Sequence, residues 1–169
     1  EQALLSIFEA LWYQPMREYK YVAVEIMRHH IRALSLQSTA FFISHALEKP
    51  WWDSIDTLTA LIGKIYLANL DLMHAENKEM DQALLHESFW MRRIAMIHQL
   101  GFKEKTDRRR LFDYALELAP EKEFFIGKAI GWALRDYSKY EPQAVLGFID
   151  NYRGVFSLLT RREALKRLH

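Results

Sequence analysis

The sequence contains no cysteine, so disulfide bonds and thiolate chemistry are excluded. Glycine and proline are scarce, at six and four of 169 residues, which leaves little of the chain for loops. No apolar run approaches the length of a membrane span, and no cleavable targeting segment is visible. The formal net charge of +1 is too small by itself to indicate a nucleic-acid-binding protein.

Apolar residues are abundant instead, and they recur every three or four positions in most segments, as in Leu111, Tyr114, Ala115 and Leu118. No segment shows the sustained alternation of a half-buried strand. Thr160 and Glu163 have the spacing of a capping box for the final helix. The sequence therefore predicts an all-α protein, with helices near residues 2–13, 16–33, 38–47, 54–69, 81–100, 107–118, 122–140, 142–151 and 160–168.

Two of the predicted helices repeat one another. The segment ESFWMRRIAM (87–96) aligns with EFFIGKAIGW (123–132) at a shift of 36 residues, which pairs Phe89 with Phe125 and Arg92 with Lys128. Repeats of this length predict an α-α superhelix, a HEAT-like solenoid of antiparallel helix pairs, here as a single domain over residues 1–169. Because inner helices of a solenoid line one concave surface, Arg93 and Lys128 are expected to face the same ligand.

The motif PWWDSID places Trp51, Trp52, Asp53 and Asp56 together at the start of a helix. In one interpretation the indoles pack in the core, Asp53 caps the helix, and Asp56 adds favourable charge to the first turn. In the other, Asp56 follows Trp52 by four residues, so both side chains lie on one helical face and form a site. The motif alone does not decide between them.

Four segments together, PWWDSIDTL, FWMRRIAMIHQL, EFFIGKAIGWALRDY and LLTRREALKRL, resemble the AlkD-like DNA alkylation repair enzymes, which are HEAT-like DNA glycosylases. The resemblance implies hydrolysis of the N-glycosidic bond of cationic alkylated purines, such as 3-methyladenine and 7-methylguanine, in duplex DNA. It also implies a cytoplasmic monomer with access to the nucleoid, without cofactor, metal or membrane association. Family members carry additional N-terminal helices that this chain, which starts at Glu1, is expected to lack. The functional residues map to Trp52, Asp56, Arg93 and Trp132.

The chemistry of these residue types fits such a reaction. Departure of an alkylated purine leaves positive charge on the sugar, which the Asp56 carboxylate can stabilise while it orients or deprotonates a water. An indole attracts a cation through its face by roughly 0.5–2 kcal/mol. Trp52 and Trp132 could therefore bracket a cationic nucleotide, while Arg93 holds the phosphates. We expect all four residues to converge on the concave side of the solenoid.

Other residues have competing interpretations. Trp51 and Trp90 are predicted to lie in the core, and Asp53 to act as a cap. His29 and His30 lack a third ligand nearby, so no metal site is expected. Either DNA phosphates or solvent are expected to surround the remaining basic candidates, which are Lys128, Arg135, Arg161, Arg162 and Lys166, with Arg108, Arg109 and Arg110 as a further basic run.

Two non-enzymatic classes compete with a glycosylase. A HEAT-like scaffold would need the repeats but no set of Trp, Asp and Trp side chains. A paralogue that only binds DNA would need the basic residues but could dispense with Asp56. Because the sequence retains Asp56, the enzyme is the favoured prediction.

Overall fold

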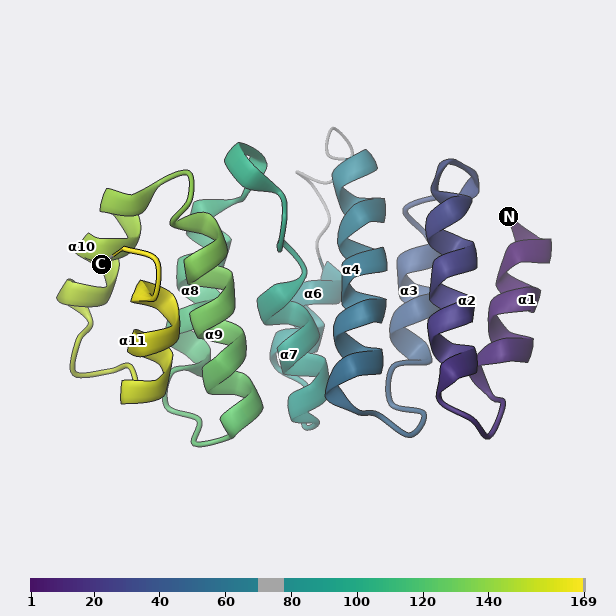
Figure 1. Ribbon diagram of the computed structural model, residues 1–169, viewed down its shortest axis with the longest axis horizontal. Coiled ribbons are helices and arrows are strands. Elements are labelled where there is room, and N and C mark those ends of the chain that lie inside the picture. Colours follow the sequence, from purple (N-terminus) through teal and green to yellow (C-terminus); the bar gives the residue numbers. More distant parts are fainter. Residues whose placement is uncertain (70–77, 169) are drawn as a thin grey trace. The chain divides into compact units, whose positions relative to one another are not determined.

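The computed structural model describes residues 1–69 and 78–168, and every regular element in these ranges is helical. The predicted all-α class is therefore confirmed. None of the helices in these ranges is long and apolar enough to cross a membrane. Figure 1 labels the helices, whose bounds are α1 Gln2–Trp12, α2 Glu18–His29, α3 Ser38–Ser44, α4 Trp52–Ala68, α6 Lys78–Leu84, α7 Phe89–Ile97, α8 Arg108–Leu118, α9 Phe124–Tyr137, α10 Pro142–Asn151 and α11 Leu158–Leu165, with 3-10 turns η1 Ile31–Ala33 and η2 Lys103–Lys105.

The chain divides into two compact units, Glu1–Glu79 and Met80–His169. In the first unit α2 packs against both α1 and α4, and α3 packs against α4. Phe8 stacks on Trp12 with ring centroids 4.8 Å apart, and the Trp12 indole donates a hydrogen bond of 2.9 Å to the carbonyl of His45. This aromatic cluster ties α1 to the segment that follows α3. The prediction of a single repeat domain stays a prediction.

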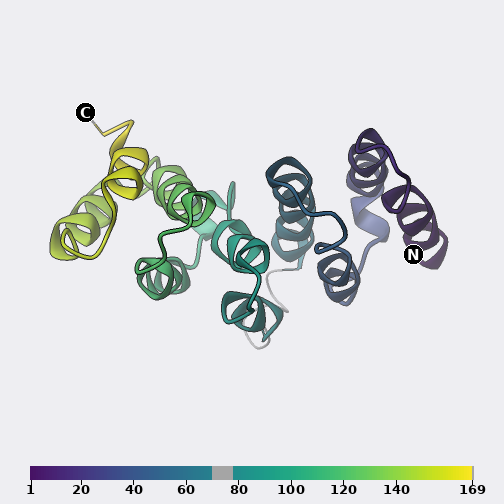
Figure 2. The same ribbon diagram turned by 90° about the horizontal axis from the view of Figure 1, so that it is seen from below.

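The second unit has two layers of helices. Figure 2 shows α7, α9 and α11 in one layer, with α6, α8 and α10 in the other, and α9 contacts α7, α8, α10 and α11. The rings of Phe89 and Phe125, which the sequence repeat aligns, stack with centroids 6.3 Å apart and planes 5° apart. Equivalent positions of α7 and α9 therefore lie against one another, as a stack of helix pairs requires.

Two glycines allow α9 and α11 to approach closely. A methyl group added at Gly131 would lie 2.4 Å from Cβ of Glu163 and 3.1 Å from the carbonyl oxygen of Thr160. Gly127 lies one turn earlier on the same face, and its carbonyl accepts a bond of 3.3 Å from the Thr160 hydroxyl. The missing side chains let the backbone of α11 pack directly on α9.

Several predicted helices differ from the structure, and the one over 16–33 ends at His29, before the 3-10 turn η1. The helix predicted over 81–100 is two helices, because Ser88 adopts an extended conformation as the N-cap of α7 and its N–H donates to His86 Nδ1. The predicted capping box of the last helix is wrong. α11 begins two residues earlier, at Leu158, and its cap is Ser157, whose hydroxyl accepts the N–H of Thr160.

Candidate nucleic-acid interface

In the first unit, Trp52 and Asp56 lie on an exposed row of α4. Trp51 occupies the N-cap with extended backbone angles, so the helix begins at Trp52. The Trp52 side chain is 44% exposed, and Asp56, one turn later, is half-buried. The exposed residues Ala60 and Lys64 continue the row at the same four-residue spacing. The opposite face of α4 is buried, so the row presents an indole and a carboxylate away from the core of its unit.

The predictions that Trp51 lies in the core and that Asp53 caps the helix were wrong. Trp51 is 43% exposed rather than in the core, and the Arg17 guanidinium carbon lies 5.8 Å from its ring centroid. Asp53 lies inside the first turn rather than at the N-cap. Its carboxylate accepts hydrogen bonds from the Tyr21 hydroxyl at 2.7 Å, the Ser54 N–H at 2.6 Å and Arg17 at 3.2 Å. Asp53 therefore connects α4 to Tyr21 on α2 and to Arg17, which immediately precedes α2.

The electrostatics of Asp53 follow from these contacts. Partial burial alone would raise the pKa of the Asp53 carboxyl group, but the bonds from Tyr21, Ser54 and Arg17 outweigh it and hold the pKa below its ordinary value. The same contact raises the pKa of the Tyr21 hydroxyl, because its proton is held by the carboxylate. Asp53 is thus charged and joins two helices, and Asp56 is the carboxylate that lies one turn after Trp52 on α4.

In the second unit, Arg93 and Trp132 are brought together. The Arg93 guanidinium carbon lies 5.3 Å from the Trp132 ring centroid, and its Nη1 donates a bond of 2.6 Å to the carbonyl of Phe125. The Arg93 side chain is only 1% exposed. Trp90, as predicted, is buried nearby and packs against Phe125, with centroids 5.1 Å apart. The planar cation therefore holds the Trp132 indole through a cation–π contact.

A stripe of partly exposed residues runs along α9. Lys128, Trp132 and Arg135 occur at spacings of four and three residues, which places them on one helical face, and all three are half-buried. Lys128 Nζ lies 2.8 Å from one carboxylate oxygen of Glu163, and Arg135 lies 3.0 Å from the other. Two cations thus share one carboxylate, so these three groups together keep one net positive charge beside the indole.

Glu163, which the sequence predicts as part of a helix cap, instead pairs with two cations of this stripe. The hydrogen bond from Lys128 lowers the pKa of the Glu163 carboxyl group and outweighs the effect of burial; Arg135 and Lys166 lower it further. The signal for this role, a separation of 35 residues from Lys128 and 28 from Arg135, is visible only once α9 and α11 are known to pack together.

A small hollow of about 180 Å³ lies beside Trp132. Asp136, in its wall, accepts a bond of 2.7 Å from the N–H of Gly101 and pairs with Lys139 at 2.5 Å. Gly101 has φ of +84°, which favours glycine, in the turn after α7. Three of the lining side chains are cationic, so the hollow suits an anionic group; its lining residues are Leu100, Trp132, Arg135, Asp136, Lys139 and Arg167.

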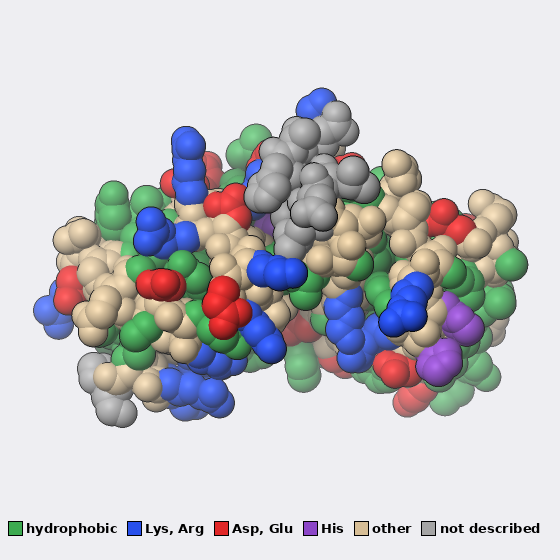
Figure 3. All heavy atoms as spheres, turned by 90° about the horizontal axis from the view of Figure 1, so that it is seen from above, with side chains coloured by type: hydrophobic (Ala, Val, Ile, Leu, Met, Phe, Trp, Pro, Cys, Tyr) green, Lys and Arg blue, Asp and Glu red, His purple; other side chains and the backbone are tan. Residues whose placement is uncertain are grey.

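The remaining basic candidates lie on or after α11. Arg162 and Lys166 are exposed, whereas Arg161 is half-buried. Figure 3 shows that lysine and arginine side chains on the face it presents alternate with acidic ones and do not merge into one basic surface. In the described residues no three His, Asp or Glu side chains come together to hold a metal ion.

Trp52 and Asp56 belong to the first unit, and Arg93, Lys128, Trp132 and Arg135 to the second. The structure brings Arg93 to Trp132 and places Lys128 and Arg135 on the same stripe. That all four predicted catalytic residues converge stays a prediction.

Comparison with known proteins identifies the family. A family model described as DNA alkylation repair enzyme matches residues 1–168. The chain belongs to the DNA alkylation repair enzyme family. A solved structure titled "Predicted DNA alkylation repair enzyme from Enterococcus faecalis" is similar to this chain, with 34% identity and a TM-score of 0.91, over 99% of this chain and 76% of that one. No curated protein gives a significant match. The resemblance inferred from the four sequence segments is thereby confirmed at the level of the family.

Proposed function

We propose that this member of the DNA alkylation repair family is a DNA glycosylase that hydrolyses the N-glycosidic bond of cationic alkylated purines, 3-methyladenine and 7-methylguanine, in duplex DNA. The observation that carries the proposal is the row on α4, where the Asp56 carboxylate lies one turn from the exposed indole of Trp52. Family membership supports a repair role.

The reaction needs no covalent intermediate. The bond between C1′ and the purine nitrogen breaks, and its electron pair leaves with the base, which neutralises the positive charge that alkylation placed on it. The sugar then carries oxocarbenium character, which Asp56 stabilises electrostatically. Water bonds to C1′ and gives up a proton, with Asp56 as the general base, so that the products are the free base and an abasic sugar.

The other residues bind and orient the DNA. Trp52 and Trp132 present indole surface that attracts the cationic nucleotide. Lys128 and Arg135 on the stripe of α9, together with the exposed Arg162 and Lys166, contact phosphates. Because the Arg93 guanidinium is committed to Trp132 and the carbonyl of Phe125, we assign it as a positioning residue for the indole.

Selectivity follows from the charge and lability of the lesion. The face of α4 that carries Asp56 offers a carboxylate and an indole but no set of amide side chains to read the edge of an extruded base. Cationic lesions should therefore be cut, bulky adducts on a cationic purine should be tolerated, and neutral lesions should be poor substrates.

The test is single-turnover release of bases from alkylated duplex DNA, analysed by chromatography. Asp56→Asn keeps the shape and removes the charge, so it should slow excision by about 100-fold or more while DNA affinity stays within about twofold. Asp113→Asn is the matched control, because Asp113 is an exposed carboxylate of α8 paired with Arg109. Wild-type excision by Asp56→Asn, or equal excision of neutral lesions, would refute the mechanism. Duplex binding without base release would instead indicate the non-catalytic paralogue.

A further inference from the structure

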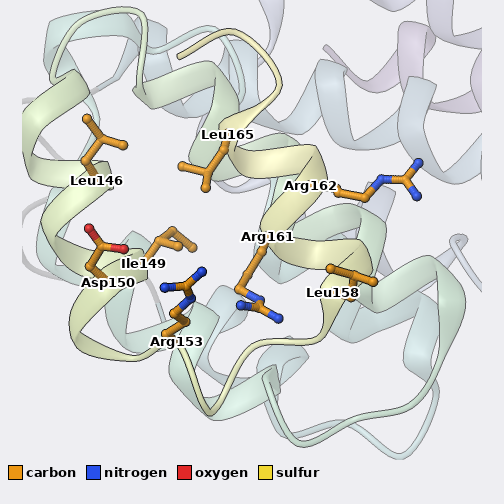
Figure 4. Close-up of a pocket in the computed structure, with 8 residues that line it drawn as sticks. All are labelled: Leu146, Ile149, Asp150, Arg153, Leu158, Arg161, Arg162 and Leu165. Carbon is orange, nitrogen blue, oxygen red and sulfur yellow. The ribbon is translucent and has the colours of Figure 1, made fainter. Parts of the chain in front are cut away.

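The second unit contains a groove between α10 and α11 that, apart from Arg162, has no part in the proposed function. It encloses about 430 Å³, and Figure 4 shows the side chains of both helices around it. We call it the C-terminal groove, defined by its lining residues Leu146, Ile149, Asp150, Arg153, Leu158, Arg161, Arg162 and Leu165.

The groove is built from two helical faces. On α10 and the turn after it, the lining positions 146, 149, 150 and 153 follow the spacing of one helix face. On α11, Leu158, Arg161 and Leu165 do the same. The residues of α11 that contact α9, Thr160 and Glu163, occupy a different face. The C-terminal groove is therefore separate from the stripe of α9.

Four of the lining side chains are apolar: Ile149 is buried, Leu146 and Leu165 are half-buried, and Leu158 is exposed. Leu158, at the first position of α11, is 66% exposed, an unusual environment for so large an apolar side chain at a concave surface. A groove with apolar side chains bordered by charged ones is typical of surfaces that bind protein segments.

The charges around the groove favour an acidic partner. Three arginines and one aspartate line it, which leaves a net positive charge. In Figure 4, Arg153 and Arg161 both extend into the space between the helices, while Arg162 extends away from α10. Among the described residues, no ion pair or side-chain hydrogen bond neutralises Arg153 or Arg161, and Arg161 Nε is buried without an acceptor. A carboxylate from outside would compensate this charge.

We propose that the C-terminal groove binds an amphipathic helix of a partner protein, with leucine-like side chains on one face and carboxylates on its flanks. The apolar side chains would enter between Leu146, Leu158 and Leu165, and the carboxylates would pair with Arg153 and Arg161. A groove between two helices, with apolar walls and charged edges, suits this mode of recognition. Nucleic acid fits less well, because its backbone offers phosphates but no apolar side chains for the leucines.

The experiment uses the whole chain and a synthetic helical peptide of about 15 residues, near the length at which an isolated helix gains stability in water. Its leucines lie at positions i, i+3, i+4 and i+7, and its flanks carry glutamate. A peptide with lysine for glutamate tests charge, and one of scrambled order tests the apolar face. Fluorescence anisotropy should show binding of the acidic amphipathic peptide alone. Absence of binding, or equal binding of the scrambled peptide, would overturn the proposal.

Variants locate the binding site. Leu158→Ser and Arg153→Glu, both at exposed positions, should each weaken peptide binding by about tenfold or more, as expected for central contacts. Arg109→Glu is the control, because its side chain is 92% exposed on α8 outside the groove, and it should change binding less than twofold. Thermal unfolding of each variant shows whether the fold is kept, and Arg153→Ala replaces Leu158→Ser if that variant is unfolded.

Two further measurements exclude other occupants. If sedimentation shows a dimer that Leu158→Ser dissociates, the groove binds a second copy of this chain, and the proposal is overturned. If Arg153→Glu weakens binding of duplex DNA as much as binding of the peptide, the arginines serve phosphates, which also overturns it. Unchanged duplex affinity in Arg153→Glu, with peptide binding lost, is the result we expect.

Discussion

Replacing Gly131 with alanine tests whether the close contact of α9 with α11 holds the second unit together. The added methyl group would lie 2.4 Å from Cβ of Glu163, whereas carbon atoms pack best at roughly 3.5–4.0 Å. The helices must therefore separate locally by roughly 1 Å, at a cost of about 1–3 kcal/mol for overpacking. Alanine also favours the helix by about 1 kcal/mol over glycine, which partly offsets that cost.

A second glycine provides the control. Gly147 lies inside α10, and a methyl group added there meets nothing within 4 Å, so Gly147→Ala gains the helix preference without a clash. The difference in free energy of unfolding between the two variants cancels the propensity effect and should be about 1–3 kcal/mol. Urea unfolding, followed by circular dichroism, measures it. If Gly131→Ala were as stable as Gly147→Ala, the close packing inferred from the structure would be refuted.

Three other predictions concern the side chains of His98, Glu163 and Arg93. His98 is buried, and burial lowers its pKa from 6.5 to about 4; the unfolded chain therefore binds more protons between these values, and this histidine should lower stability by roughly 3 kcal/mol as pH drops through that range, a contribution that His98→Gln should remove in pH-dependent unfolding. Glu163→Gln removes the negative charge shared by Lys128 and Arg135, so duplex affinity at low salt should rise and its salt dependence steepen; titrations giving equal or weaker affinity would contradict the assignment of these cations to phosphates. Arg93→Lys keeps the charge but loses the planar contact with Trp132, so excision should fall more than duplex affinity, and near-ultraviolet circular dichroism should report a less ordered indole; an equal loss of both would indicate a phosphate contact instead.

The sequence predicted the helices well because their apolar periodicity is a local property. It also predicted the relation between α7 and α9, since Phe89 and Phe125 were aligned by the repeat and are stacked in the structure. The break at Ser88 was missed because the apolar pattern continues through it, while the extended backbone and the bond to His86 leave no periodic signal.

The sequence predicted which candidate residues share a helix face, but it did not predict their partners. Trp52 and Asp56 are on one exposed row because four-residue spacing fixes their relation within a helix. Trp51 precedes that helix in an extended conformation, so helical periodicity said nothing about its burial. Pairing of Glu163 with Lys128 and Arg135 depends on the packing of two helices about one repeat apart, which no local pattern encodes.

The glycine face of α9 also sets an order of events during synthesis of the chain. Lys128 leaves the ribosome 35 residues ahead of Glu163, a delay of roughly 2–7 s at bacterial and eukaryotic elongation rates. Throughout that interval α11 does not pack on the backbone of α9 at Gly127 and Gly131. Lys128 and Arg135 also lack the carboxylate that they share in the folded unit. The second unit can therefore become cooperative only after α11 has emerged. A nascent chain that ends between α10 and α11 should be cleaved by proteases and bound by chaperones far more than a chain that extends through Leu165.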